Sequence, residues 1–162
     1  MAKQPQDIET IVQSFKDYAL GDINHNRCKP IAAFILSICF IDQLSSFRYD
    51  WKIKYSKRAP WIFRDYMKAY HPIGPKIYEF FRNGLIHNYS SRGRFDIDNV
   101  GYENVPFFEN GDIIHINTNV FISHLETAFD ELVTEFKDPS SDAHKNALET
   151  SKHNPVFIDT RK

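Results

Sequence analysis

The strongest constraint on the fold is an apolar run in the first third of the chain. Residues 31–41 read IAAFILSICFI, with Ser37 as the polar interruption. Pro30 stands where proline is favoured in a first helical turn, and apolar residues continue to Phe47 on most faces of such a helix. The run is shorter than the roughly 18 to 20 residues that cross a bilayer. It therefore predicts a buried central helix and no membrane contact.

Length and cysteine content limit the class of protein. A chain of 162 residues has the length of one domain, with or without an appendage. The first ten residues, MAKQPQDIET, lack the apolar segment of a signal peptide, and Cys28 and Cys39 are too few for a disulfide framework. These features favour a cytoplasmic protein.

Apolar residues recur with helical spacing in several other segments. Residues 7–20 carry such a stripe, with Asp7 as the expected N-cap and Gly21 as the expected stop. Three further segments are a connector over 48–59, a short helix over 60–70 that Pro60 opens, and an amphipathic helix over roughly 73–89.

The apolar period changes from helical to alternating in the following segment. Residues 95–98 alternate, and two apolar runs, 105–108 and 113–116, flank Asn110-Gly111. Asn-Gly between apolar runs predicts a hairpin, because both central residues of a type I′ turn need positive φ. A last long helix is expected to begin at a cap provided by Asn117, Thr118 or Asn119 and to end near Asp138-Pro139.

Together these elements predict a mainly α fold. We expect an antiparallel helical bundle of about five helices with an inserted β-hairpin or small sheet near residues 93–117. The helical domain would cover residues 1–138, and residues 139–162 would form a polar C-terminal extension with a short helix at 141–151.

The net charge of −1 conceals a division along the chain. Residues 1–94 hold fifteen Lys and Arg against eight Asp and Glu, whereas residues 95–162 hold five against thirteen. Basic residues are densest over 48–68, where they alternate with aromatic residues, a composition that suits single-stranded nucleic acid. The alternative interpretation is that the rings pack inward and the charges form a solvated face. The candidate substrate-binding cations are Lys52, Lys54, Lys57, Arg58 and Arg64.

Residues 80–91, FFRNGLIHNYSS, hold the side chains needed to cut RNA without a metal. A histidine such as His87 moves protons near neutral pH, and an arginine such as Arg82 stabilises charge on phosphate. At 100° per residue the two lie 140° apart around a helix, whereas Asn83 and His87 share a face. Asn83 is thus placed to orient the imidazole, and a two-fold pairing of this helix would bring Arg82 and His87 together from two subunits.

The pattern R-N-x-x-x-H-x-Y, from Arg82 through Asn83 and His87 to Tyr89, resembles the signature of the HEPN superfamily (higher eukaryote and prokaryote nucleotide-binding domains). The resemblance implies a helical bundle, metal-independent endoribonuclease activity, and a homodimer formed through the Arg82–His87 helix. It implies Arg82 and His87 as the catalytic pair, with Asn83 beside them. It also implies a setting in toxin–antitoxin or antiphage defence systems, with Tyr89 as the site where a nucleotidyltransferase-type antitoxin would add nucleotides.

Two alternatives remain open at this stage. The first is a non-catalytic HEPN-like module that binds a nucleotide, RNA or a protein partner, with the motif holding a dimer together. The second is a purely structural role, in which His87 bonds a carbonyl, Arg82 pairs with Glu79 or Asp65, and Asn83 is a cap. No histidine pair has HxxxH or HxH spacing and no glycine-rich phosphate loop occurs, so we expect neither metal nor cofactor.

Overall fold

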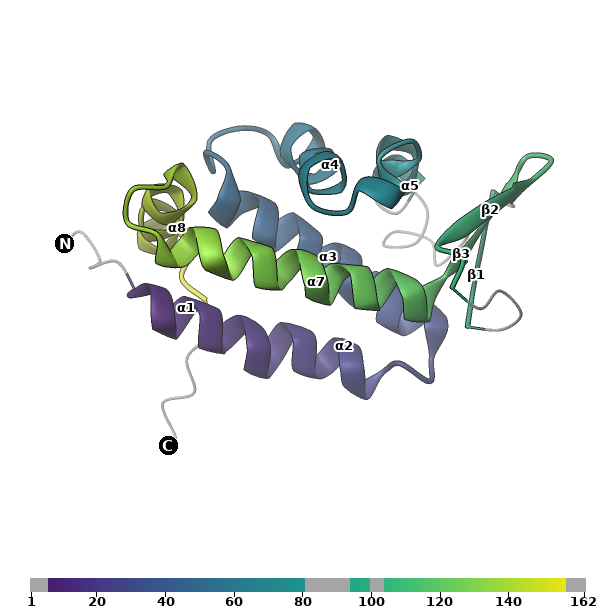
Figure 1. Ribbon diagram of the computed structural model, residues 1–162, viewed down its shortest axis with the longest axis horizontal. Coiled ribbons are helices and arrows are strands. Elements are labelled where there is room, and N and C mark those ends of the chain that lie inside the picture. The colour runs from purple at the N-terminus through teal and green to yellow at the C-terminus, as the bar shows by residue number, and fades with distance from the viewer. Residues whose placement is uncertain (1–5, 81–93, 100–103, 157–162) are drawn as a thin grey trace.

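The computed structural model describes residues 6–80, 94–99 and 104–156, and the statements below concern these ranges. The chain is mainly helical, with a small three-stranded mixed sheet at one end (Figure 1). The helices are α1 (Ile8–Ser14), a π-helical turn (Phe15–Leu20), α2 (Gly21–His25), α3 (Pro30–Arg48), α4 (Tyr55–Asp65), a 3-10 turn (Lys68–Tyr70), α5 (Gly74–Phe80), α7 (Thr118–Lys137) and α8 (Asp142–His153). The strands are β1 (Phe95–Asp98), β2 (Phe107–Asn110) and β3 (Ile113–Asn117).

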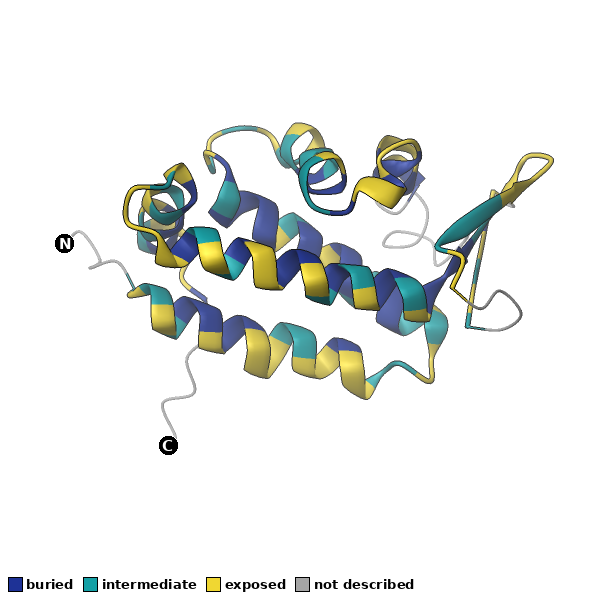
Figure 2. Cartoon of the chain, viewed as in Figure 1, coloured by how far each residue is buried: buried dark blue, intermediate teal, exposed yellow. Residues whose placement is uncertain are grey.

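The predicted central helix is confirmed as α3. It contacts α2, α4, α7, α8 and β1, so elements from both ends of the chain meet on it. Its rings interlock with those of α7: Phe34 lies edge-on to Phe121 at a centroid distance of 5.0 Å, and Phe40 lies 5.6 Å from Phe129. Figure 2 shows the buried residues along the facing sides of these helices.

α3 also bears on the question of membrane contact. By length and composition it is the one helix in the described ranges that could cross a membrane, and 56% of its most apolar window is buried inside the fold. Core helices of globular proteins meet the same criterion. The apolar run at 31–41 is too short to cross a bilayer, but the complete helix α3 is longer than that run. The length of the run therefore does not test the prediction that the protein makes no membrane contact.

The N-terminal helix does not stop at Gly21, contrary to expectation. Asp7 caps α1 as predicted, its carboxylate accepting the Thr10 N–H at 2.8 Å. Gly21 has right-handed helical geometry (φ −57°, ψ −50°), and helical structure continues through it to His25. Glycine ends a helix when it adopts positive φ. Here the buried side chain of Ile23 holds the next turn against the fold instead.

α4 begins earlier than the sequence predicts. It starts at Tyr55 within the expected connector, so Pro60 lies inside the helix instead of opening it. Lys57 and Arg58 donate their backbone N–H groups to the Lys54 carbonyl and form the first turn. Burial of Ala59, Ile62 and Phe63 along one side stabilises α4 around the proline.

The hairpin and the small sheet are confirmed, with a different turn. β2 and β3 are antiparallel, and β1 pairs with β3 in parallel, giving the order β1-β3-β2. Because Asn110 pairs with Ile113, the central turn residues are Gly111 and Asp112, and Gly111 alone of the two has positive φ (59°). Glycine at the first central position is typical of a type II′ turn, not of the expected type I′ turn. Asn117 then caps α7 by accepting the Val120 N–H at 3.2 Å, as predicted.

The short helix predicted at 141–151 is confirmed as α8, and it packs against α3, α7 and α1. α8 buries Ala143, Ala147 and Thr150, and the Thr150 hydroxyl donates to the Ser46 carbonyl of α3 at 2.7 Å. Beyond α8, the backbone N–H of Val156 donates to the Gln6 side chain at 2.8 Å. The sequence 139–162 is polar overall, yet small side chains spaced along α8 suffice to bury one face.

Candidate nucleic-acid interface

The four motif residues follow α5 directly in the chain. Arg82, Asn83, His87 and Tyr89 lie outside the described residues, so their roles stay predictions. α5 itself is fixed by close packing, since a Cβ added to Gly74 would lie 2.9 Å from Phe63 Cβ of α4. Within the described ranges, the motif is therefore preceded by a helix held tightly against α4.

The aromatic residues of the basic segment are buried or half-buried. None of the six rings belongs to an exposed residue, and the two most buried are Tyr49 and Phe63. Trp61 lies edge-on to Tyr49 at 5.2 Å, and Trp51 lies 4.5 Å from the His153 ring of α8. This arrangement supports the interpretation in which the rings serve packing. The six rings are those of Tyr49, Trp51, Tyr55, Trp61, Phe63 and Tyr66.

Arg58, one of the five candidate cations, is engaged within the fold. Its guanidinium donates to the carbonyls of Trp51 (2.9 Å) and Ile53, and its Nε donates to Ser45 Oγ at 3.1 Å. The planar guanidinium offers donors in several directions, which lets one side chain hold a loop and a helix together. Arg58 therefore fixes the loop between α3 and α4, and we leave it out of the candidate binding surface.

Arg48 connects three helices through a partly buried polar cluster. Its Nε donates to the Tyr66 hydroxyl and lies 3.0 Å from Glu135 Oε2 of α7. The Tyr66 hydroxyl in turn donates to Glu135 Oε1 at 2.7 Å. Burial, followed by this bond to a carboxylate, raises the pKa of Tyr66 and keeps its hydroxyl protonated.

A second cluster lies beside the first. The Tyr49 hydroxyl donates to Asp65 at 2.6 Å, and Arg64 binds both oxygens of the same carboxylate at 2.6 and 2.8 Å. The hydrogen bond from Arg64, together with that from Tyr49, lowers the pKa of Asp65 although partial burial opposes the shift. Burial raises the pKa of Tyr49. These groups join α4 to the end of α3.

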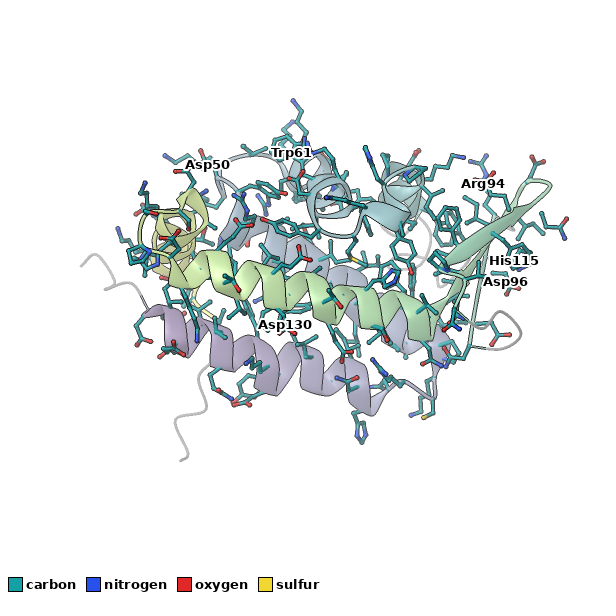
Figure 3. The ribbon with its side chains drawn as sticks, in the orientation of Figure 1. Asp50, Trp61, Arg94, Asp96, His115 and Asp130 are labelled. Atoms are coloured by element: carbon teal, nitrogen blue, oxygen red, sulfur yellow. The ribbon has the colours of Figure 1, made fainter. Side chains whose placement is uncertain are left out.

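The remaining candidate cations lie on the outer side of the same segment. Lys52, Lys54, Lys57 and Arg64 are all exposed, the first two on the loop and the last two on α4. Residues 57 and 64 are seven apart, so they share a face of the helix about 10 Å apart along its axis. Trp61 stands between them, and Figure 3 shows it at the outer edge of the molecule. We call these four residues the outer cation row.

The acidic half of the chain is partly neutralised within the fold. Glu126 of α7 pairs with Arg27 at 2.9 Å, and Glu135 pairs with Arg48. Asp130 and Glu131 of the same helix are exposed, and Figure 3 shows Asp130 on α7. The basic and acidic halves of the sequence therefore meet across α7 instead of forming two separate surfaces.

The sheet contains a side-chain pair that sequence reasoning did not identify. His115 Nδ1 lies 2.9 Å from Asp96 Oδ2 on the neighbouring strand, and the imidazole stacks on Phe108 at a centroid distance of 4.3 Å. The three residues are aligned by strand register. The alternation of apolar residues in the sequence predicted strands but not their pairing. The parallel pairing of β1 with β3 is what places Asp96 beside His115. Figure 3 labels both.

Chemically, the described residues offer a cation surface and no metal site. No group of three or more His, Cys, Asp or Glu that could hold a metal occurs in the described part of the chain. The outer cation row could bind an anionic polymer, whereas the catalytic candidates of the motif follow α5 outside the described residues.

Comparisons with known proteins give no independent assignment. No protein-family model, curated protein or solved structure matches this chain. The resemblance to the HEPN superfamily accordingly rests on the motif residues and on their place in a mainly helical chain.

Proposed function

We propose that this protein is a HEPN-type metal-independent endoribonuclease whose helices form the antiparallel bundle of that superfamily. The observation that carries the proposal is the sequence R-N-x-x-x-H-x-Y from Arg82 to Tyr89. Two features support it: the motif directly follows a helix in a mainly helical fold, and a row of exposed cations lies on the adjoining helix α4.

The proposed reaction uses a nucleophile that RNA itself supplies. One imidazole, that of His87, accepts the proton of the 2′-hydroxyl as its oxygen attacks the adjacent phosphorus, or donates a proton to the departing 5′-oxygen. Arg82 stabilises the charge that builds on the phosphate, and Asn83 orients the imidazole. The P–O5′ bond breaks, leaving a 2′,3′-cyclic phosphate and a 5′-hydroxyl.

The assembly and setting belong to the same proposal. A homodimer through a helix carrying Arg82 and His87 would place both catalytic side chains in one site, because side chains five residues apart on an ideal helix point 140° apart and would not meet within one subunit. A cytoplasmic toxin or antiphage effector is the proposed setting. Tyr89 is the proposed target of a nucleotidyltransferase-type antitoxin.

A second candidate function is a non-catalytic HEPN-like module that binds nucleotide, RNA or a protein partner. The packing of the aromatic residues against other side chains favours the form that binds a protein partner, because proteins that bind single strands commonly present rings for base stacking. In this version His87→Ala weakens the dimer and changes no RNA.

The deciding experiment is incubation of end-labelled RNA with purified protein in excess chelator, followed by mapping of product ends. His87→Ala and Arg82→Ala are each expected to reduce cleavage by about a hundredfold or more. The matched control is His25→Ala, because His25 is an exposed histidine at the end of α2. Intact RNA after incubation with a folded dimeric wild type would reject the nuclease and favour the binding module.

A further inference from the structure

Three lysines of the outer cation row lie close together along the chain without a carboxylate partner in the described ranges, whereas Lys16, Lys29 and Lys68, which also lack one, are scattered. Lys137, Lys145 and Lys152 each pair with a carboxylate, at 3.1, 3.6 and 2.5 Å. Within the described ranges, Lys52, Lys54 and Lys57 have no such ion pair, and Arg64 alone of the row is paired, with Asp65. The ammonium groups of Lys52, Lys54 and Lys57 are therefore available to an external anion.

The spacing of these cations suits an extended anion. Lys57 and Arg64 lie on one side of α4, about 10 Å apart along its axis, and Lys54 directly precedes the helix as its N-cap. Lys52 extends the row onto the loop, whose carbonyls are held by Arg58. The row therefore presents several charges over a span longer than a single phosphate group.

Both tryptophans beside the outer cation row already have side-chain partners within the described ranges. Trp61 is occupied by Tyr49 on its edge and by the Arg64 guanidinium, 5.5 Å from its ring centroid. Trp51 is stacked with His153. Neutralising phosphate without stacking bases produces binding that is insensitive to sequence and sensitive to salt.

We infer that the outer cation row binds the sugar-phosphate backbone of single-stranded RNA and does not read its bases. The choice of RNA as the polymer rests on the proposed function, while the mode of binding rests on the row itself.

The inference has two measurable consequences. Homopolymers of U, A and C bind with similar affinity, and single-stranded DNA, which lacks the 2′-hydroxyl, binds without being cut and inhibits cleavage.

The test uses the full chain and fluorescent 2′-O-methyl RNA homopolymers, which cannot undergo 2′-hydroxyl attack. Binding is followed by anisotropy between about 50 and 200 mM salt. The test variant is Lys52→Ala/Lys54→Ala/Lys57→Ala, and the control is Lys16→Ala/Lys29→Ala/Lys145→Ala, which removes three exposed lysines elsewhere. The test variant should weaken binding about tenfold for every homopolymer and lower the salt slope by about 2, and the control should do neither.

Several outcomes would overturn the inference. They are equal losses in the two triple variants, a tenfold preference for one homopolymer that Trp61→Ala abolishes, or binding of phosphatidylserine vesicles in place of RNA. The proposed nuclease is judged separately. If RNA is cut but the test variant leaves binding and KM unchanged, the row is rejected and the nuclease stands; if binding follows the row but no RNA is cut, the nuclease is rejected.

Discussion

The inner and outer sides of the segment from residue 48 to residue 66 use the same residue types in opposite ways. On the inner side, Arg48 and Arg58 are held by hydroxyl, carboxylate and carbonyl groups. On the outer side, Lys54 and Lys57 reach solvent without an acidic partner in the described ranges. The difference teaches that a basic, aromatic stretch of sequence is not one surface: the two inner arginines stabilise the fold, whereas the outer lysines remain exposed.

The largest expected effect on stability comes from Arg58, the inner arginine of α4 that holds the preceding loop. Arg58→Ala removes the donors that satisfy two loop carbonyls and Ser45 Oγ, and should lower the free energy of unfolding by about 2 to 3 kcal/mol. The neighbouring Lys57→Ala should change it by less than about 0.5 kcal/mol. Urea denaturation of both variants measures the contrast, and equal values for the two would remove the distinction between the sides.

Packing on the inner side is tested next by a pair of glycine substitutions. A Cβ at Gly74 would lie 2.9 Å from Phe63 of α4, so Gly74→Ala should destabilise by about 2 kcal/mol. The nearest such contact for Gly21 is the Lys16 carbonyl at 3.6 Å, and its geometry is helical. Gly21→Ala should therefore stabilise by about 0.5 to 1 kcal/mol. Thermal denaturation that gave both changes the same sign would contradict the packing of α5 on α4.

Local patterns in the sequence predicted the elements whose causes are local. The apolar run after Pro30 predicted α3, and the stripe after the Asn117 cap predicted α7. Asn110-Gly111 predicted the hairpin but placed its turn one residue early. Either Asn110-Gly111 or Gly111-Asp112 could form the centre of the turn, and the pairing of Asn110 with Ile113 selects the second.

The features that the sequence did not predict, the start of α4 and the packing of α8, depend on distant partners. α4 begins before Pro60 because Arg58 organises a loop whose geometry no periodicity describes. α8 joins the core through Thr150 and the Ser46 carbonyl, a contact between residues far apart in the sequence. The candidate site shows the same limit of sequence reasoning. The sequence suggested five binding cations, and the fold shows that Arg58 is engaged by loop carbonyls whereas the lysines are exposed.

A smaller effect is expected at the junction of α3, α4 and α7. Tyr66→Phe removes the hydroxyl that accepts from Arg48 and donates to Glu135, but leaves the ion pair between those two residues. The expected loss is about 1 to 1.5 kcal/mol in the free energy of unfolding. Tyr18→Phe, at an exposed tyrosine, is the control. A loss no greater than that of the control would show that the cluster does not stabilise the junction.

The smallest effect lies where the two sides meet, at the carboxylate shared by Tyr49 and Arg64. The pKa of Asp65 is lowered by its hydrogen bonds, so its stabilising contribution is fully present above the unfolded-state value near 3.9 and is lost as the pH falls through the folded value. The difference in unfolding free energy between wild type and Asp65→Asn should accordingly be greatest near pH 7 and shrink below about pH 4.

Because the Arg64–Asp65 pair is partly exposed, solvent screening keeps this difference within about 1 kcal/mol. Repeating the pH series in an Arg64→Ala background removes the largest cause of the lowered pKa, and the pH-dependent part of the difference should decrease there. A difference that is constant with pH, or unchanged by Arg64→Ala, would mean that Arg64 is not the partner of Asp65 in solution. Arg64 would then belong wholly with the lysines of the outer cation row, and its substitution should weaken RNA binding as strongly as that of Lys57.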